Sequence, residues 1–218
     1  MAAVLGIAIL VGAIAGLATG GRFAQLGSAH LRAIPLLVIG AVVQVLVLGR
    51  VITASTPIVV LLLVATYAAL AGFAIANLGR GGMGVILAGI ILNAIPIALN
   101  SGMPVEATAI VRARIAKPTD LPLLDFGAKR HLAAAGDHLR ILDDRFPEWV
   151  THHVLSIGDL VIAVGVGAVT AGLLHPGTGR RRGRAHARRR HPSAGPDPRT
   201  HATHAAHRAH ATPEPARS

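Results

Sequence analysis

The sequence predicts an all-α integral membrane protein with five transmembrane helices. Of its 218 residues 52% are hydrophobic, and residues 1–100 contain no Asp or Glu. Four arginines in that region separate apolar runs close to the ~20 residues that a helix needs to cross a bilayer. We therefore expect a four-helix transmembrane core over 1–100, an extracytoplasmic loop over 101–153, a fifth transmembrane helix over 154–174 and a disordered cytoplasmic tail over 175–218.

The first predicted span covers residues 2–19. No positively charged segment precedes it and its apolar run is long, so a retained span fits better than a signal peptide. Gly12, Gly16 and Gly20 recur at intervals of four and would leave one helix face without side chains. Such a face allows close helix packing inside a membrane, either within the chain or between copies.

The second and third predicted spans are Ile34–Gly49 and Pro57–Leu78. Gln44 is the one strongly polar side chain of the second span. A lone amide in such a helix usually forms a hydrogen bond to a neighbouring helix. Pro57 suits the first turn of a helix, where its missing N–H would be unpaired anyway.

The fourth predicted span is Met83–Leu99. Spacings of three and four place polar or small residues on one face of this helix. Pro96 should free one backbone carbonyl and kink the helix. The amides on this face either satisfy backbone groups within the bundle or line a small polar site. The residues on this face are Gly89, Asn93, Pro96 and Asn100.

The connection over residues 101–153 differs from the spans in composition. It holds seven basic and seven acidic residues and is interrupted by four prolines, so one continuous helix is excluded. A structureless loop of this length is uncommon in a folded domain. We therefore expect a loop that is partly ordered against the helices.

The fifth span, Val154–Leu174, carries a charged residue, Asp159. An ionisable group inside a span is usually functional or specifically paired, because exposing it to lipid costs a few kcal/mol or more. Asp159 also suits the N-terminal turn of a helix that Ser156 caps. Both readings remain open, and in either one Asn93 or Asn100 is the natural partner.

The tail over 175–218 lacks large apolar side chains and is predicted to be disordered. Its arginines place it in the cytoplasm, so that the N-terminus and the loop over 101–153 lie outside. The same arginines suit anionic lipid headgroups, and without interleaved aromatic side chains no nucleic-acid partner is expected. The headgroup contacts predicted are Arg180, Arg181, Arg182, Arg188, Arg189 and Arg190.

No metal or cofactor site is predicted. The chain has no cysteine, no HExxH motif and no phosphate-binding GxxxxGK[ST] loop. A His/carboxylate centre would require the loop histidines to converge on an acidic residue. The side chains in question are His131, His152, His153, Asp144 and Asp159.

Several motifs together resemble an uncharacterised family of actinobacterial membrane proteins, a domain-of-unknown-function (DUF) family. The resemblance covers roughly residues 1–174 and implies a polytopic membrane protein without assigning an activity. Ser101 and Asp143 stand where glycine would be expected. The motifs are Gly20-Gly21-Arg22, Gln44, Asn77, Asn93, Asn100-Ser101-Gly102-Met103-Pro104-Val105, Lys129-Arg130-His131, Leu142 to Pro147 and Ser156-Ile157-Gly158-Asp159.

Three functions fit this multi-pass protein of the cell membrane. The favoured one is a non-enzymatic scaffold, assembly or interaction protein, whose partners are the bilayer and a further membrane protein. The second is a small-solute transporter or channel component that uses Gln44, Asn93 and Asp159. The third is a membrane-embedded enzyme acting on a lipid-linked substrate at the outer surface. The polar cluster proposed for any of these roles is Asp159, Ser156, Asn93, Asn100, His131 and Asp144.

Overall fold

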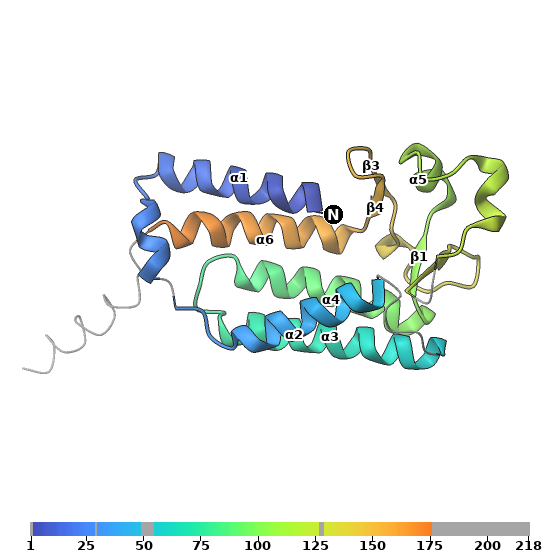
Figure 1. The fold of residues 1–218 in the computed structure, drawn as a ribbon, viewed down its shortest axis with the longest axis horizontal. Helices are drawn as coiled ribbons and strands as arrows, with labels where there is room; N and C mark the ends of the chain where they lie inside the picture. Colours follow the sequence, from blue (N-terminus) through green and yellow to red (C-terminus); the bar gives the residue numbers. More distant parts are fainter. Residues whose placement is uncertain (1, 29, 49–54, 127–128, 176–218) are drawn as a thin grey trace, which may run out of the picture. The chain divides into compact units, whose positions relative to one another are not determined.

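A computed structural model describes residues 2–28, 30–48, 55–126 and 129–175. The fold is mostly helical, and a long helix lies on each of the five apolar runs (Figure 1). Residues 176–218 of the predicted tail, with its six headgroup arginines, lie outside the described residues. The long helices are α1 (Ala2–Ala18), α2 (Ile34–Leu48), α3 (Thr56–Ala76), α4 (Met83–Asn100) and α6 (Ile157–Leu173).

Two of these helices are long and apolar enough to cross a membrane. The segments concerned are Pro57–Ala76 in α3 and the whole of α4, Met83–Asn100. The other three apolar helices are shorter, and α1 and α6 have 17 residues each. At about 1.5 Å per residue such a helix is about 25 Å long, slightly less than the ~30 Å hydrocarbon core.

The helices pack side by side in the order α1, α6, α4, α3, α2. The last helix of the chain therefore lies between the first and the fourth, as Figure 1 shows. Each helix leaves large apolar side chains exposed, which is the pattern expected of surfaces that face lipid tails. Examples are Leu10, Ile14, Val42, Val45, Leu61, Ile91 and Val164.

Glycines let α1 approach the backbone of α6. A Cβ on Gly12 would lie 2.2 Å from the Gly167 carbonyl oxygen, and one on Gly16 would lie 2.8 Å from the Leu174 side chain. Gly20 has open space around it and a φ of +90°, so it follows the end of α1 instead of packing on α6. Gly21, the next residue, makes the close contact with Leu174.

At the end of the helices near Arg22, backbone and amide hydrogen bonds join the connecting segments to the helices. The Arg22 N–H donates to the Leu174 carbonyl at 2.7 Å, which joins the chain after α1 to the end of α6. Asn77, the C-cap of α3, donates from Nδ2 to the Arg32 carbonyl and accepts from the Arg32 N–H. One amide side chain thus fixes the segment before α2 against α3.

Residues 101–153 form a folded layer at the other end of the helices, which we call the cap. It contains two small sheets, so the prediction of an all-α fold was wrong in this region. Three-residue strands carry too little periodic pattern to be recognised in a sequence. Strand β1 (Met103–Val105) pairs in parallel with β2 (Arg130–Leu132), and β3 (Phe146–Glu148) pairs antiparallel with β4 (His153–Leu155). The short helices of the cap are α5 (Ala107–Arg112), η2 (Pro118–Leu123) and η3 (Arg140–Leu142), while η1 (Phe23–Ser28) follows α1.

A left-handed turn directs the chain from α4 into the cap. Ser101 has φ +55°, a conformation that glycine adopts more easily, which accounts for the glycine expected there from the resemblance. The Met103 N–H then donates to the Lys129 carbonyl at 2.7 Å. Asn100 accepts from the His138 N–H at 2.7 Å and donates to its carbonyl at 3.0 Å. The cap is therefore attached at the end of α4 through the hydrogen bonds of Asn100 and of Met103.

The contact between α1 and α6 gives a first prediction. Gly12→Ala should destabilise the protein by about 1–3 kcal/mol, because the added methyl would overlap the backbone of α6. Gly6→Ala on the same helix is the control, since a Cβ there meets nothing within 4 Å. Thermal unfolding in detergent measures both variants. Equal melting temperatures would show that the two helices do not pack through Gly12.

Candidate functional site

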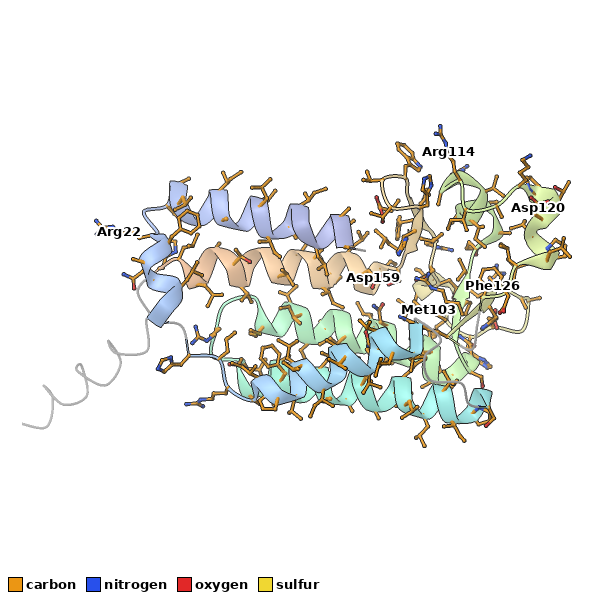
Figure 2. All side chains as sticks on the ribbon, in the orientation of Figure 1. Arg22, Met103, Arg114, Asp120, Phe126 and Asp159 are labelled. Carbon is orange, nitrogen blue, oxygen red and sulfur yellow. The ribbon has the colours of Figure 1, made fainter. Side chains whose placement is uncertain are left out.

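Asp159 lies at the cap end of α6, opposite the end that carries Arg22 (Figure 2). Its Oδ1 accepts a hydrogen bond from Nδ2 of Asn93 on α4 at 2.8 Å. Its Oδ2 accepts from the Ser156 N–H at 3.3 Å, and its own N–H donates to Ser156 Oγ at 3.0 Å. Ser156 Oγ in turn donates to Asn93 Oδ1 at 2.7 Å. The three side chains form a closed ring of hydrogen bonds between two helices.

This ring combines the two readings of Asp159 that the sequence left open. Ser156 and Asp159 form a capping box, a local device that satisfies the first N–H groups of a helix. Asn93 adds the link to α4, and all three residues are buried. A Cβ on Gly158 would lie 2.0 Å from Asn93 Oδ1, so only glycine leaves room for this amide.

A pair of charged residues from the cap, Arg130 and Asp144, lies next to the ring. Arg130 Nη2 is 2.7 Å from Asp144 Oδ2 and also donates to the Val154 carbonyl at 3.3 Å. Burial raises the pKa of Asp144 to about 7, although the Arg130 guanidinium acts in the opposite direction. Burial likewise lowers the pKa of Lys129, and the neighbouring Arg130 adds to that effect. These charges act on one another because little water separates them.

A cavity of about 750 Å³ joins the ring and the cap charges to the interior of the helix row. All five long helices contribute to its wall, and η1 contributes as well. Most of the wall is apolar, with residues such as Leu5, Ile9, Leu37, Leu70, Ile86 and Val166. Polar side chains gather at the cap end of the cavity. They are Asn93, Asp159, Lys129, Arg130, Asp144 and His153.

The cavity is long in the direction of the helices. Along α6 its wall runs from Asp159 to Leu173. A helix rises about 1.5 Å per residue, so this stretch measures about 21 Å. One leaflet of the hydrocarbon core is about 15 Å thick, half of the ~30 Å total. The cavity therefore has the dimensions and polarity of an amphiphile, with room for a polar head beside the cap and for a hydrocarbon chain between the helices.

The remaining predicted site residues lie elsewhere. Asn100 bonds to His138, and His131 Nε2 lies 3.0 Å from Asp137 Oδ1. The His152 ring lies against the Ala113 carbonyl, and of the four histidines in 101–153 only His153 lines the cavity. Among the described residues no group of three His, Asp or Glu side chains is arranged to hold a metal ion. The structure thus brings Asp159, Ser156 and Asn93 together, places Asp144 nearby, and separates Asn100 and His131 from them.

Sequence reasoning missed the basic part of the site. Lys129 and Arg130 entered only as a motif of the resemblance, and Tyr67, which also lines the cavity, was not singled out. Lys129 and Arg130 reach the cavity because β2 pairs with β1 directly after α4. That pairing joins residues far apart in the chain, and no local pattern indicates it.

The hydrogen-bonded ring allows a test by exchange. Asp159→Asn places an amide nitrogen opposite either Asn93 Nδ2 or the Ser156 N–H, which are both donors. Asn93→Asp places a second carboxylate in contact with the carboxylate of Asp159. Each single change should lower the unfolding free energy by about 1–3 kcal/mol. The double variant Asn93→Asp/Asp159→Asn restores a complementary donor or acceptor at every position and should recover most of that loss. Asp120→Asn, at an exposed site whose carboxylate accepts a hydrogen bond from the neighbouring Thr119, is the control. Additive losses in the double variant would contradict the ring.

Asp144 should make stability depend on pH. Its native carboxyl keeps a proton up to about pH 7, whereas an unfolded Asp loses it near pH 4. The native state therefore binds more protons in this window, so the unfolding free energy falls as pH rises from about 4 to about 7. Asp144→Asn should flatten this fall, which melting temperatures between pH 5 and 8 would detect. Asp143, whose pKa burial raises to about 6, leaves some slope below pH 6 in both proteins. Parallel curves above pH 6 would contradict the assignment.

One family model matches the chain. Residues 28–170 match a family of unknown function, DUF5317, over about two thirds of the chain. The matched region begins after Gly20-Gly21-Arg22 and includes α2, α3, α4, the cap and nearly all of α6. No curated protein and no solved structure is significantly similar to the chain. On the strength of the residues matched, the chain belongs to the DUF5317 family.

Proposed function

We propose that this protein is a multi-pass protein of a bacterial cell membrane with five spans. Its N-terminus and cap lie outside and its C-terminus lies in the cytoplasm. The five apolar helices, with the cap at one end and Arg22 at the other, support this arrangement (Figure 2). The short helices α1, α2 and α6 cross with help from flanking side chains and local thinning of the bilayer.

Within the membrane its role is to hold an amphiphile, as a non-enzymatic binding protein. The cavity carries this proposal, because its wall is mostly apolar along the helices and its charged side chains lie beside the cap. An aqueous solute would gain little from the apolar wall, whereas a hydrocarbon chain gains about 0.8 kcal/mol for each CH₂ removed from water. In the bilayer the gain is smaller, so the polar end must provide the selectivity.

A small-solute path is the second candidate, since Gln44, Asn93 and Asp159 all line the same cavity. Gln44 donates to Thr66 Oγ1 at 3.2 Å, which ties it to α3. Between Gln44 and Leu173 the cavity wall is almost wholly apolar, with Thr170 as the polar exception. A transported polar solute would need a further opening at that end. Uptake lost in Asp159→Asn but retained in the double exchange variant would support a path that needs the charge in the ring.

Filling the cavity tests the binding role. Ala13 on α1 lines the cavity, and Ala13→Phe should displace the bound chain by occupying its volume. Ala15→Phe adds the same ring on an exposed face of the same helix and serves as the control. Native mass spectrometry of the protein extracted in mild detergent measures the fraction that carries an amphiphile.

We expect a bound species in wild-type protein and in Ala15→Phe, and a fraction at least several-fold lower in Ala13→Phe. Circular dichroism melts of the three proteins establish that the fold is retained. A wild-type protein that carries no amphiphile, or equal occupancy in both Phe variants, would rule the proposal out.

A further inference from the structure

The polar end of the cavity contains a cation whose hydrogen-bonding capacity is unused. Lys129 lines the cavity, and its backbone is held by the hydrogen bond from Met103 to its carbonyl. Among the residues that the structure describes, its ammonium group has no hydrogen-bond acceptor and no ion-pair partner. An ammonium has three N–H donors, and an anion that enters the cavity can accept from them. Burial lowers the pKa of Lys129 and the neighbouring Arg130 adds to that effect, so a bound anion beside it would favour its charged form.

The acidic side chains around the cavity do not supply that acceptor. Both carboxylate oxygens of Asp159 already accept hydrogen bonds, from Asn93 and from the Ser156 backbone. Asp144 is paired with Arg130 at 2.7 Å. Among the described residues neither carboxylate is therefore bonded to the Lys129 ammonium.

Arg130 offers a second donor at the same place. Its Nη2 serves Asp144 and the Val154 carbonyl, but its buried Nε has no partner among the described residues. Lys129 and Arg130 are consecutive in the chain and both line the cavity. An ammonium beside a guanidinium is the pairing that proteins use for phosphate groups, since both give charge-assisted hydrogen bonds.

We propose that the amphiphile held in the cavity is a phosphate-headed lipid, with its phosphate on Lys129 and Arg130 and its hydrocarbon chain between the helices. This inference rests on the binding function proposed above. The phosphate would supply acceptors for the free donors of both residues. The apolar wall then separates a phospholipid or lipid-linked phosphate from free phosphate, because only the former has a chain to bury.

The chain provides an internal control for the test, because Lys117 and Lys129 are its two lysines. Lys117 is exposed in the cap, away from the cavity lining. Reductive dimethylation of the folded protein in detergent, read by peptide mass spectrometry, follows both amines at once. Delipidated protein is treated with phosphatidic acid, with diacylglycerol of the same chains, or with inorganic phosphate.

Phosphatidic acid should slow the modification of Lys129 roughly tenfold and leave Lys117 unchanged, as expected for a charge-assisted contact. Diacylglycerol and inorganic phosphate at the same concentration should protect Lys129 far less. Lys129→Gln should weaken phosphatidic acid binding by native mass spectrometry roughly tenfold, with Lys117→Gln as the matched control.

Three results would overturn the inference. Equal protection by diacylglycerol and phosphatidic acid would mean that the cavity binds chains without selecting a phosphate. Equal protection by inorganic phosphate would mean a site for the free anion. Unchanged affinity in Lys129→Gln would remove this residue from the site. In the first and third cases the Ala13→Phe effect on bound amphiphile still decides the binding function independently.

Discussion

The close approach of α4 and α6 is the constraint on which the rest of the structure depends. Gly89 and Gly158 bring the two backbones so near that a methyl group on either would overlap the opposite helix. In the membrane arrangement that we propose, lipid tails give two helices no hydrophobic reason to associate, so packing and hydrogen bonds hold them together. Here the small residues supply the packing, and the ring of Asn93, Ser156 and Asp159 supplies the hydrogen bonds. Because α1 packs on α6 and α3 packs on α4, the position of this pair determines the whole row.

The same constraint determines the cavity. Five helices packed in the order α1, α6, α4, α3, α2 leave a wall to which every helix contributes. The ring lies at one end of that wall because Asp159 is in the first turn of α6 and Asn93 is near the end of α4. The cap begins immediately after α4, so its charged strand β2 is brought to the same end. Asn93 and Asp159 therefore both join α4 to α6 and line the polar end of the cavity.

The sequence was informative where a local pattern carried the signal. The apolar runs predicted all five long helices, and the charge of Asp159 next to Ser156 indicated a capped helix start whose partner is Asn93. Asn100 could not be separated from Asn93 in this way, because the left-handed Ser101 turns the chain and leaves Asn100 facing the cap. The strands, the Arg130–Asp144 pair and the cavity all depend on contacts between distant residues. The sequence of a helix that is apolar on every side does not indicate which other helices it packs against.

The place of α6 between α1 and α4 also bears on how the protein is made. In the membrane arrangement proposed above, the first helix enters the bilayer long before α6 has been synthesised, and its glycine face stays uncovered until α6 arrives. The Arg22 N–H closes the assembly by bonding to the Leu174 carbonyl, the residue at the end of that last helix. Biogenesis must therefore keep an incomplete set of helices apart from other nascent chains. In that arrangement a product interrupted before residue 157 would leave the faces of α1 and α4 that α6 covers without a partner.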